Sequence, residues 1–126
     1  MPLVRVSLRE GKTDDYRRAV GKAVHRALLE SANVPDGDEF QIISEHDVPG
    51  LVYDPTYLDI ERDDDVVFIQ ITLNEGRSTD VKKALYAQIA ALLADDPGIR
   101  KENVVISLVE VPTENWSFGN GEAQYA

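Results

Sequence analysis

Pro2 holds the position in this sequence that most favours chemistry. A small second residue allows the initiator methionine to be removed, and loss of Met1 would leave Pro2 as a secondary amine at the start of a predicted strand. A free α-amino group has a pKa of about 8, and burial or nearby cations can lower that pKa into the range of a general base. Many chains also begin with Met-Pro without catalytic consequence, so position alone leaves both interpretations open.

The composition excludes several other kinds of chemistry. The chain has no cysteine, which rules out disulfides, thiolate catalysis and cysteine-bound metals. His25 and His46 have no second ligand at a suitable spacing, and we interpret them as a helix residue and a strand-end residue. We interpret the acidic clusters as solvated surface, namely residues 14–15, 63–65 and 95–96. The sequence therefore indicates neither a metal nor an organic cofactor.

Charge and hydropathy restrict the partners. The 13 basic and 23 acidic residues give a net charge of -10, which repels a nucleic acid backbone. No apolar run approaches the roughly 20 residues that a membrane span needs, and the first residues lack the features of a secretory signal. We expect a cytoplasmic protein that acts on small molecules, with no nucleic-acid or membrane partner.

The elements that would position Pro2 come from an internal repeat with an offset of 65 residues. Residues 6–20 align without a gap on residues 71–85, and the following pairs are identical: Leu8/Leu73, Glu10/Glu75, Gly11/Gly76, Asp15/Asp80, Ala19/Ala84, Leu28/Leu93 and Glu45/Glu110. The length suits one domain, residues 1–126, with a pseudo-repeat of 2–46 and 67–111. An insert at 47–65 and a tail at 112–126 lie outside the repeat, and we expect the insert to be either a binding lid or a short hairpin against a neighbouring subunit.

Each half has the pattern strand, helix, strand. Apolar residues alternate at 4, 6 and 8 and at 69, 71 and 73, which predicts strands with one buried face. Thr13 and Ser78 are candidate N-caps, followed by helices whose apolar residues recur every three and four positions. Second strands are predicted at 40–45 and 104–111.

Such units predict an α+β fold of two tandem β-α-β units that form a four-stranded, mostly parallel sheet with two helices on one face. Strand residues outside the helix-facing set are partly apolar, which predicts that other subunits bury the second face. The residues concerned are Leu3, Ile43, Phe68, Val105 and Val109.

Four stretches together resemble one family. They are PLVRVSLREGKTD at the start, VPDGDEFQIISEH at 34–46, VVFIQITLNEGRS at 66–78 and WSFGNGEAQY at 116–125. The chain resembles the tautomerase superfamily, within it the fused β-α-β group of malonate semialdehyde decarboxylase. The resemblance covers nearly the whole chain and implies the tautomerase fold, a homotrimer and catalysis by an amino-terminal proline.

The resemblance also implies roles for individual residues. It makes Pro2 the catalytic amine and Asp38 the carboxylate that orients or activates water or substrate, although Asp38 could merely begin the second strand. Arg77 would hold the substrate carboxylate, for which a planar guanidinium is suited, or it is only a cation before a helix cap. Trp116 and Phe118 would form an apolar wall near the proline, or pin the tail to a subunit interface.

One departure affects the expected reaction. The decarboxylases carry an Arg-Pro-Arg arrangement near the second helix, whereas this chain has Asn74-Glu75-Gly76-Arg77 and one arginine. We therefore favour keto-enol tautomerisation of a small oxo or enol carboxylic acid. Decarboxylation or hydration of a 3-oxo or unsaturated acid is the alternative. If Met1 is retained, the Pro2 nitrogen is an amide, and the prediction becomes a non-catalytic oligomeric binding protein.

Overall fold

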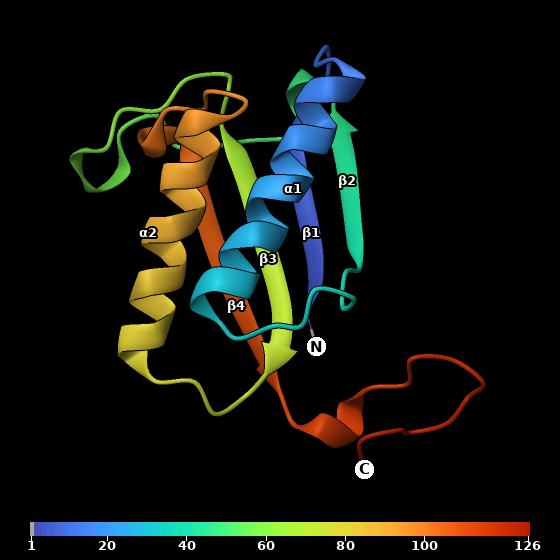
Figure 1. Ribbon diagram of the computed structural model, residues 1–126. Coiled ribbons are helices and arrows are strands. Elements are labelled where there is room, and N and C mark those ends of the chain that lie inside the picture. The colour runs from blue at the N-terminus through green and yellow to red at the C-terminus, as the bar shows by residue number, and fades with distance from the viewer. Residues whose placement is uncertain (1) are drawn as a thin grey trace.

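In a computed structural model, which describes residues 2–126, the chain forms one sheet covered on one side by two helices (Figure 1). The first half contains β1 (Leu3–Arg9), α1 (Asp14–Ser31) and β2 (Gln41–His46). The second half contains β3 (Val67–Asn74), α2 (Thr79–Asp95) and β4 (Val104–Val111). The predicted α+β fold of two β-α-β units is confirmed. The prediction that Met1 is removed concerns a residue outside the described range.

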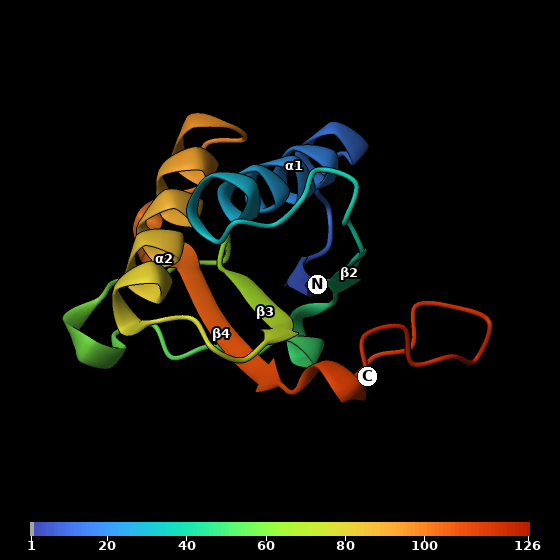
Figure 2. The same cartoon turned by 60° about the horizontal axis from the view of Figure 1, so that its bottom comes forward.

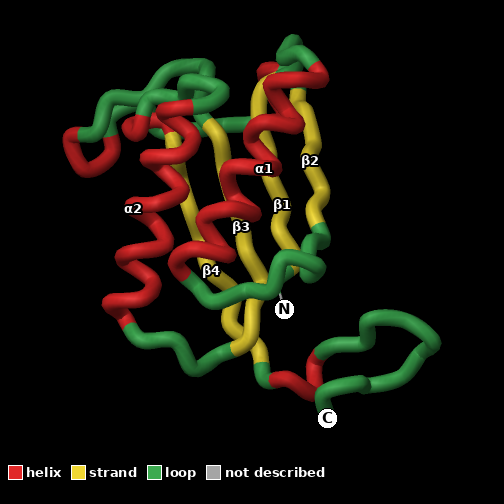
Figure 3. Tube along the Cα trace, viewed as in Figure 1, coloured by secondary structure: helices red, strands yellow, loops and turns green. Residues whose placement is uncertain are grey.

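The strand order, β2-β1-β3-β4, sets which chain segments share an edge of the sheet. The pairs β1/β2 and β3/β4 are parallel, while the central pair β1/β3 is antiparallel, with Val6 opposite Ile69. The two units therefore run in opposite directions. As a consequence, the starts of β1 and β2 lie at the same edge as the ends of β3 and β4, as the strand arrows in Figure 1 show. Figure 3 shows the same arrangement with the strands in yellow and the helices that cover them in red.

The helix starts follow the predicted caps. The Thr13 hydroxyl accepts the Tyr16 amide over 3.1 Å, and the Ser78 hydroxyl accepts the Val81 amide over 3.2 Å, which satisfies amides that lack helical partners. The helices bury their apolar faces against β1 and β3, whose alternate residues are at most 2% exposed. Neither helix in residues 2–126 has the length and apolar character to cross a membrane.

The second face of the sheet is open in the single chain, and it carries four of the five apolar residues predicted there. The prediction for Ile43 is wrong, because Ile43 pairs with the buried Val6 and therefore points toward α1. Its side chain packs beside Gly21, where a Cβ would lie 3.1 Å from Cδ1 of Ile43. Ile42 takes the open side instead and is 41% exposed. The other four residues lie on the open face: Leu3, Phe68, Val105 and Val109.

The insert at 47–65 joins the end of β2 to the start of β3, at the edge opposite Pro2 (Figure 1). Among the described residues it contains two 3-10 turns, Val48–Gly50 and Tyr57–Asp59, and no strand, so the predicted hairpin is wrong. The Arg62 guanidinium holds the loop together by donating to three of its carbonyls. Its location also excludes a lid over the Pro2 edge of its own chain.

Candidate active site

Pro2 and Asp38 reach the same sheet edge because β1 and β2 are parallel. Pro2 is buried and immediately precedes β1, and the Val4 amide donates to the Phe40 carbonyl over 3.0 Å. Asp38 lies two residues before Phe40, and its side chain is also buried, at 7% exposed. A buried carboxylate at a sheet edge is uncommon in a purely structural role, which makes this edge a candidate site.

A histidine anchors the loop that carries Asp38. Nε2 of His25, on α1, lies 3.0 Å from the Asp36 carbonyl and 3.3 Å from carboxylate oxygens of both Asp36 and Glu39. Because all of these atoms are acceptors, Nε2 carries the ring proton. The interpretation of His25 as a structural helix residue missed this anchoring, which joins residues 25 and 36–39 only in the folded chain.

Arg77 follows the end of β3, at the same edge. Its Nε and Nη2 donate to the Ala32 carbonyl over 3.3 and 3.0 Å, and Nη1 donates to the Asn74 carbonyl over 3.1 Å. Ala32 closes α1, so the guanidinium ties the end of that helix to the end of β3. A guanidinium has five N–H donors, so one on each terminal nitrogen remains for a carboxylate. The structural and the substrate-binding interpretations of Arg77 are therefore compatible.

The tail brings aromatic rings to this edge. Trp116 and Phe118 stack with ring centroids 5.1 Å apart, and the Phe118 ring lies 5.7 Å from that of Phe40, at the start of β2. Figure 2 shows that the rest of the tail projects beyond the sheet. A groove of about 380 Å³ lies between the tail and the Asp38 loop, and it is lined by Pro35, Gly37, Asp38, Phe40, Phe118, Gln124 and Tyr125.

Asn74 is a site residue that sequence reasoning did not single out. Its side-chain oxygen accepts the Trp116 indole N–H over 2.8 Å, while its carbonyl accepts from Arg77. The residue therefore connects the aromatic wall to the cation. Its place among residues 74–77, where the chain departs from the decarboxylases, was the available signal.

The repeat creates a second, equivalent edge at which other residues replace Pro2, Asp38 and Arg77. There Val67 stands in place of Pro2, Asn103 in place of Asp38 and Lys12 in place of Arg77. The Val67 nitrogen is an internal amide, and Lys12 pairs with Asp65, whose hydrogen bond and charge raise the pKa of the ammonium. Asn103 is 1% exposed and holds Asp63 of the insert. Of the two edges, the one with Pro2 has a buried aspartate and an arginine that no carboxylate of residues 2–126 is recorded to pair with.

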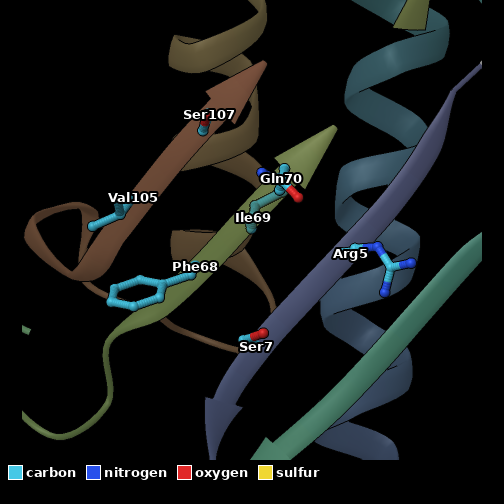
Figure 4. A pocket seen from close by; sticks show the side chains of 7 residues that line it. All are labelled: Arg5, Ser7, Phe68, Ile69, Gln70, Val105 and Ser107. Carbon is cyan, nitrogen blue, oxygen red and sulfur yellow. The ribbon is translucent and has the colours of Figure 1, made fainter. Parts of the chain in front are cut away.

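The open sheet face has a separate hollow of about 370 Å³. Figure 4 shows its lining, which comes from β1, β3 and β4 and includes Arg5, Phe68 and Val105. This hollow lies in the middle of the face, away from the Pro2 edge. Within residues 2–126, no three His, Asp or Glu side chains are grouped so that they could hold a metal ion.

Two family descriptions, both of a tautomerase enzyme, match the chain over residues 38–119 and 2–58. The chain belongs to the tautomerase superfamily. It is similar to the probable tautomerase YusQ of Bacillus subtilis (strain 168), with 41% identity over 98% of each chain. The predicted resemblance is confirmed.

Solved structures of malonate semialdehyde decarboxylase share the fold of this tautomerase superfamily member. One matches with a TM-score of 0.92 and 31% identity, over 98% of this chain and 95% of that chain. A second, the FG41 malonate semialdehyde decarboxylase inhibited by 3-bromopropiolate, matches with a TM-score of 0.92 and 35% identity over 98% and 93%. The protein is accordingly an enzyme of the isomerase or related decarboxylase and hydratase type.

Proposed function

We propose that this enzyme catalyses keto-enol tautomerisation of a small oxo acid, with Pro2 as the base after removal of Met1. The observation that carries the proposal is the placing of a buried carboxylate, Asp38, and a half-buried guanidinium, Arg77, at the sheet edge where Pro2 lies. A base, a carboxylate and a cation for an anionic substrate are what proton transfer beside a carboxylic acid requires.

In this mechanism the substrate carboxylate lies against the two N–H groups of Arg77 that the backbone does not occupy. The neutral Pro2 amine removes the proton from the enol hydroxyl and becomes a cation, and the resulting enolate takes a proton from that cation at carbon. Asp38 orients the substrate or a water molecule. The aromatic wall of Trp116 and Phe118 excludes water and thereby strengthens the charge interactions.

A second candidate is decarboxylation or hydration of a 3-oxo or unsaturated acid, with Pro2 as a cation or a Schiff-base amine. It is supported by the likeness to malonate semialdehyde decarboxylase, for which one of the matched structures addresses both decarboxylase and hydratase activities. The single arginine among residues 74–77 argues against it. A pH profile separates the two: activity that needs neutral proline rises with pH through the proline pKa, and activity that needs the cation falls.

We also propose that the enzyme works as a homotrimer, as its resemblance to this superfamily implies. The open sheet face supports assembly, because Val105 and Val109, on the outer strand β4, are 37% and 38% exposed there. Exposed apolar side chains on an uncovered sheet face are typical of an interface with other chains. The proposed substrate is a small carboxylic acid.

The test combines intact mass with an enol-to-keto assay on phenylenolpyruvate. We expect a mass without Met1, and loss of most turnover in Pro2→Ala, while Pro55→Ala on the insert retains it. Asp38→Asn should lower turnover by about 100-fold, the scale of a lost general acid-base or orienting group. A retained Met1, or turnover that is unchanged in Pro2→Ala, would overturn the amine mechanism. A retained Met1 together with absence of turnover would favour a non-catalytic binding protein.

A further inference from the structure

The repeat also duplicates a glutamate, Glu45 in the first half and Glu110 in the second, near the turn that leads from each first strand into its helix. In the first half, a carboxylate oxygen of Glu45 accepts the amides of Gly11 and Lys12 over 3.0 and 3.2 Å. The other oxygen accepts from the Arg17 guanidinium over 2.8 Å. The end of β2 is thereby tied to both the turn and the first turns of α1.

The second half repeats the ion pair of this arrangement 65 residues later. The Lys82 ammonium donates to Glu110 over 2.6 Å, at the position that Arg17 occupies in the first half. The pKa of Glu110 is lowered by that hydrogen bond and charge and, further, by a hydrogen bond from the Gly76 amide and by the Arg77 charge. The Glu75 amide donates to the Val111 carbonyl over 3.0 Å, which keeps the turn beside the end of β4.

The turn itself is a conformation that needs this support. Gly76 has φ of 116° and Gly11 has φ of 101°, which lie in the region that residues with a Cβ rarely adopt. Glycine permits the turn but does not stabilise it, because glycine loses more conformational freedom on folding than other residues. A fixed carboxylate that accepts hydrogen bonds from the turn amides restricts the backbone conformation of the turn, and thereby the position of the residue that follows the glycine.

That residue differs between the halves. After Gly11 the chain places Lys12, which pairs with Asp65 of the insert. After Gly76 it places Arg77, whose hydrogen bonds to the Ala32 and Asn74 carbonyls leave one N–H on each terminal nitrogen. The same kind of turn therefore carries Lys12, which is paired with a carboxylate, at one edge and Arg77, which is bound to carbonyls only, at the other.

We infer that Glu110, held by Lys82, is the positioning residue that sets Arg77 for the substrate carboxylate. The inference rests on the proposed function only in the use of Arg77 for an anionic ligand. Glu110 touches no substrate, so its effect appears in carboxylate affinity and not in the chemical step. Glu45 performs the same structural task at the other edge, which makes it a matched control.

The experiment compares Glu110→Ala with Glu45→Ala in the full chain. Trp116 is the chain's single tryptophan and contacts Asn74 beside Arg77, so its fluorescence can report binding of pyruvate. We expect Glu110→Ala to weaken pyruvate binding, and to raise KM for phenylenolpyruvate, by about tenfold, with kcat within about twofold. Glu45→Ala should leave both affinities within about twofold, although it lowers the unfolding midpoint comparably.

Further ligands and variants separate a positioning role from loss of structure. Pyruvamide, which lacks the charge, should bind wild type and Glu110→Ala alike. If Glu110→Ala does not fold, Glu110→Gln and Lys82→Met should each show a smaller loss of pyruvate affinity.

Equal effects of Glu110→Ala and Glu45→Ala on pyruvate binding, or no effect of either, would overturn the positioning role even where turnover depends on Pro2. Turnover independent of Pro2, with pyruvate affinity still sensitive to Glu110, would refute the proposed function alone. Absence of pyruvate binding by wild type, with turnover still dependent on Pro2, would overturn the positioning role and leave the proposed function standing.

Discussion

The Trp116 indole N–H donates to the side-chain oxygen of Asn74 over 2.8 Å, and this hydrogen bond connects the tail to the end of β3. The residues are 42 positions apart in the chain. Among residues 2–126, this is the recorded hydrogen bond between the side chains of the aromatic wall and the strand that precedes Arg77. The position of the tail should therefore depend on the Asn74 side chain.

Asn74→Ala should loosen the tail. Deletion of the acceptor leaves a half-buried indole N–H without its partner, which costs about 1 kcal/mol. We expect the Trp116 emission to shift to longer wavelength and kcat/KM for phenylenolpyruvate to fall by about fivefold. Asn115→Ala, at an exposed position beside Trp116, is the control, and an equal shift in that variant would contradict the prediction.

Arg77→Lys should weaken carboxylate binding although the charge is kept. An ammonium cannot hold the Ala32 and Asn74 carbonyls and also present two N–H groups to a ligand, because it is not a planar fork. We expect KM for phenylenolpyruvate to rise about tenfold, as a lost charge-assisted hydrogen bond would cause. Lys12→Arg at the opposite edge should leave KM unchanged; a rise there would mean that the effect is not local to the site.

Val109→Arg should disrupt assembly. A charge placed on the open face would have to be buried without a partner in the oligomer, at a cost of several kcal/mol. We expect light scattering to report the mass of a single chain for this variant and a multiple of it for wild type. Ala94→Arg, on the exposed side of α2, should not change the mass. A Val109→Arg protein with the wild-type mass would exclude this face as the interface.

Asp63→Asn should change how stability depends on pH. The pKa of Asp63 lies below its ordinary value of 3.8, because the carboxylate accepts the Asp65 amide and further hydrogen bonds from Asn103 and Arg100. A carboxylate with a lowered folded-state pKa stabilises the protein above its unfolded pKa, and this stabilisation is lost as pH falls through the folded pKa. Urea unfolding should therefore show a lower midpoint than wild type at pH 7 and a smaller difference at about pH 3.

The exposed Asp59 offers the control for that measurement. Asp59→Asn removes one charge from the same insert, at a residue whose φ of 57° asparagine tolerates. We expect its stability to follow wild type across the pH range. A midpoint difference for Asp63→Asn that stays constant between pH 7 and pH 3 would show that Asp63 does not contribute through its charge.

Much of the fold could be predicted because its determinants are local. Alternation of apolar residues with period two, apolar recurrence every three and four residues, and hydroxyl caps at Thr13 and Ser78 each depend on neighbours along the chain. The 65-residue repeat doubled the evidence for each element. The error at Ile43 arose where pattern is weakest, in a short edge strand with apolar residues on both faces.

The strands, helices and caps could be read from the amino-acid sequence, as could the candidate residues Pro2, Asp38 and Arg77 and the superfamily. The antiparallel pairing of β1 and β3, and with it the set of chain segments that share an edge with Pro2, became known only from the folded chain. The tertiary structure also decided how far Arg77 is engaged by carbonyls, that Asn74 joins it to Trp116, and that the opposite edge is neutralised by the insert. The reason is physical: these contacts join residues tens of positions apart, and their formation depends on sheet register and side-chain packing, which no local pattern encodes.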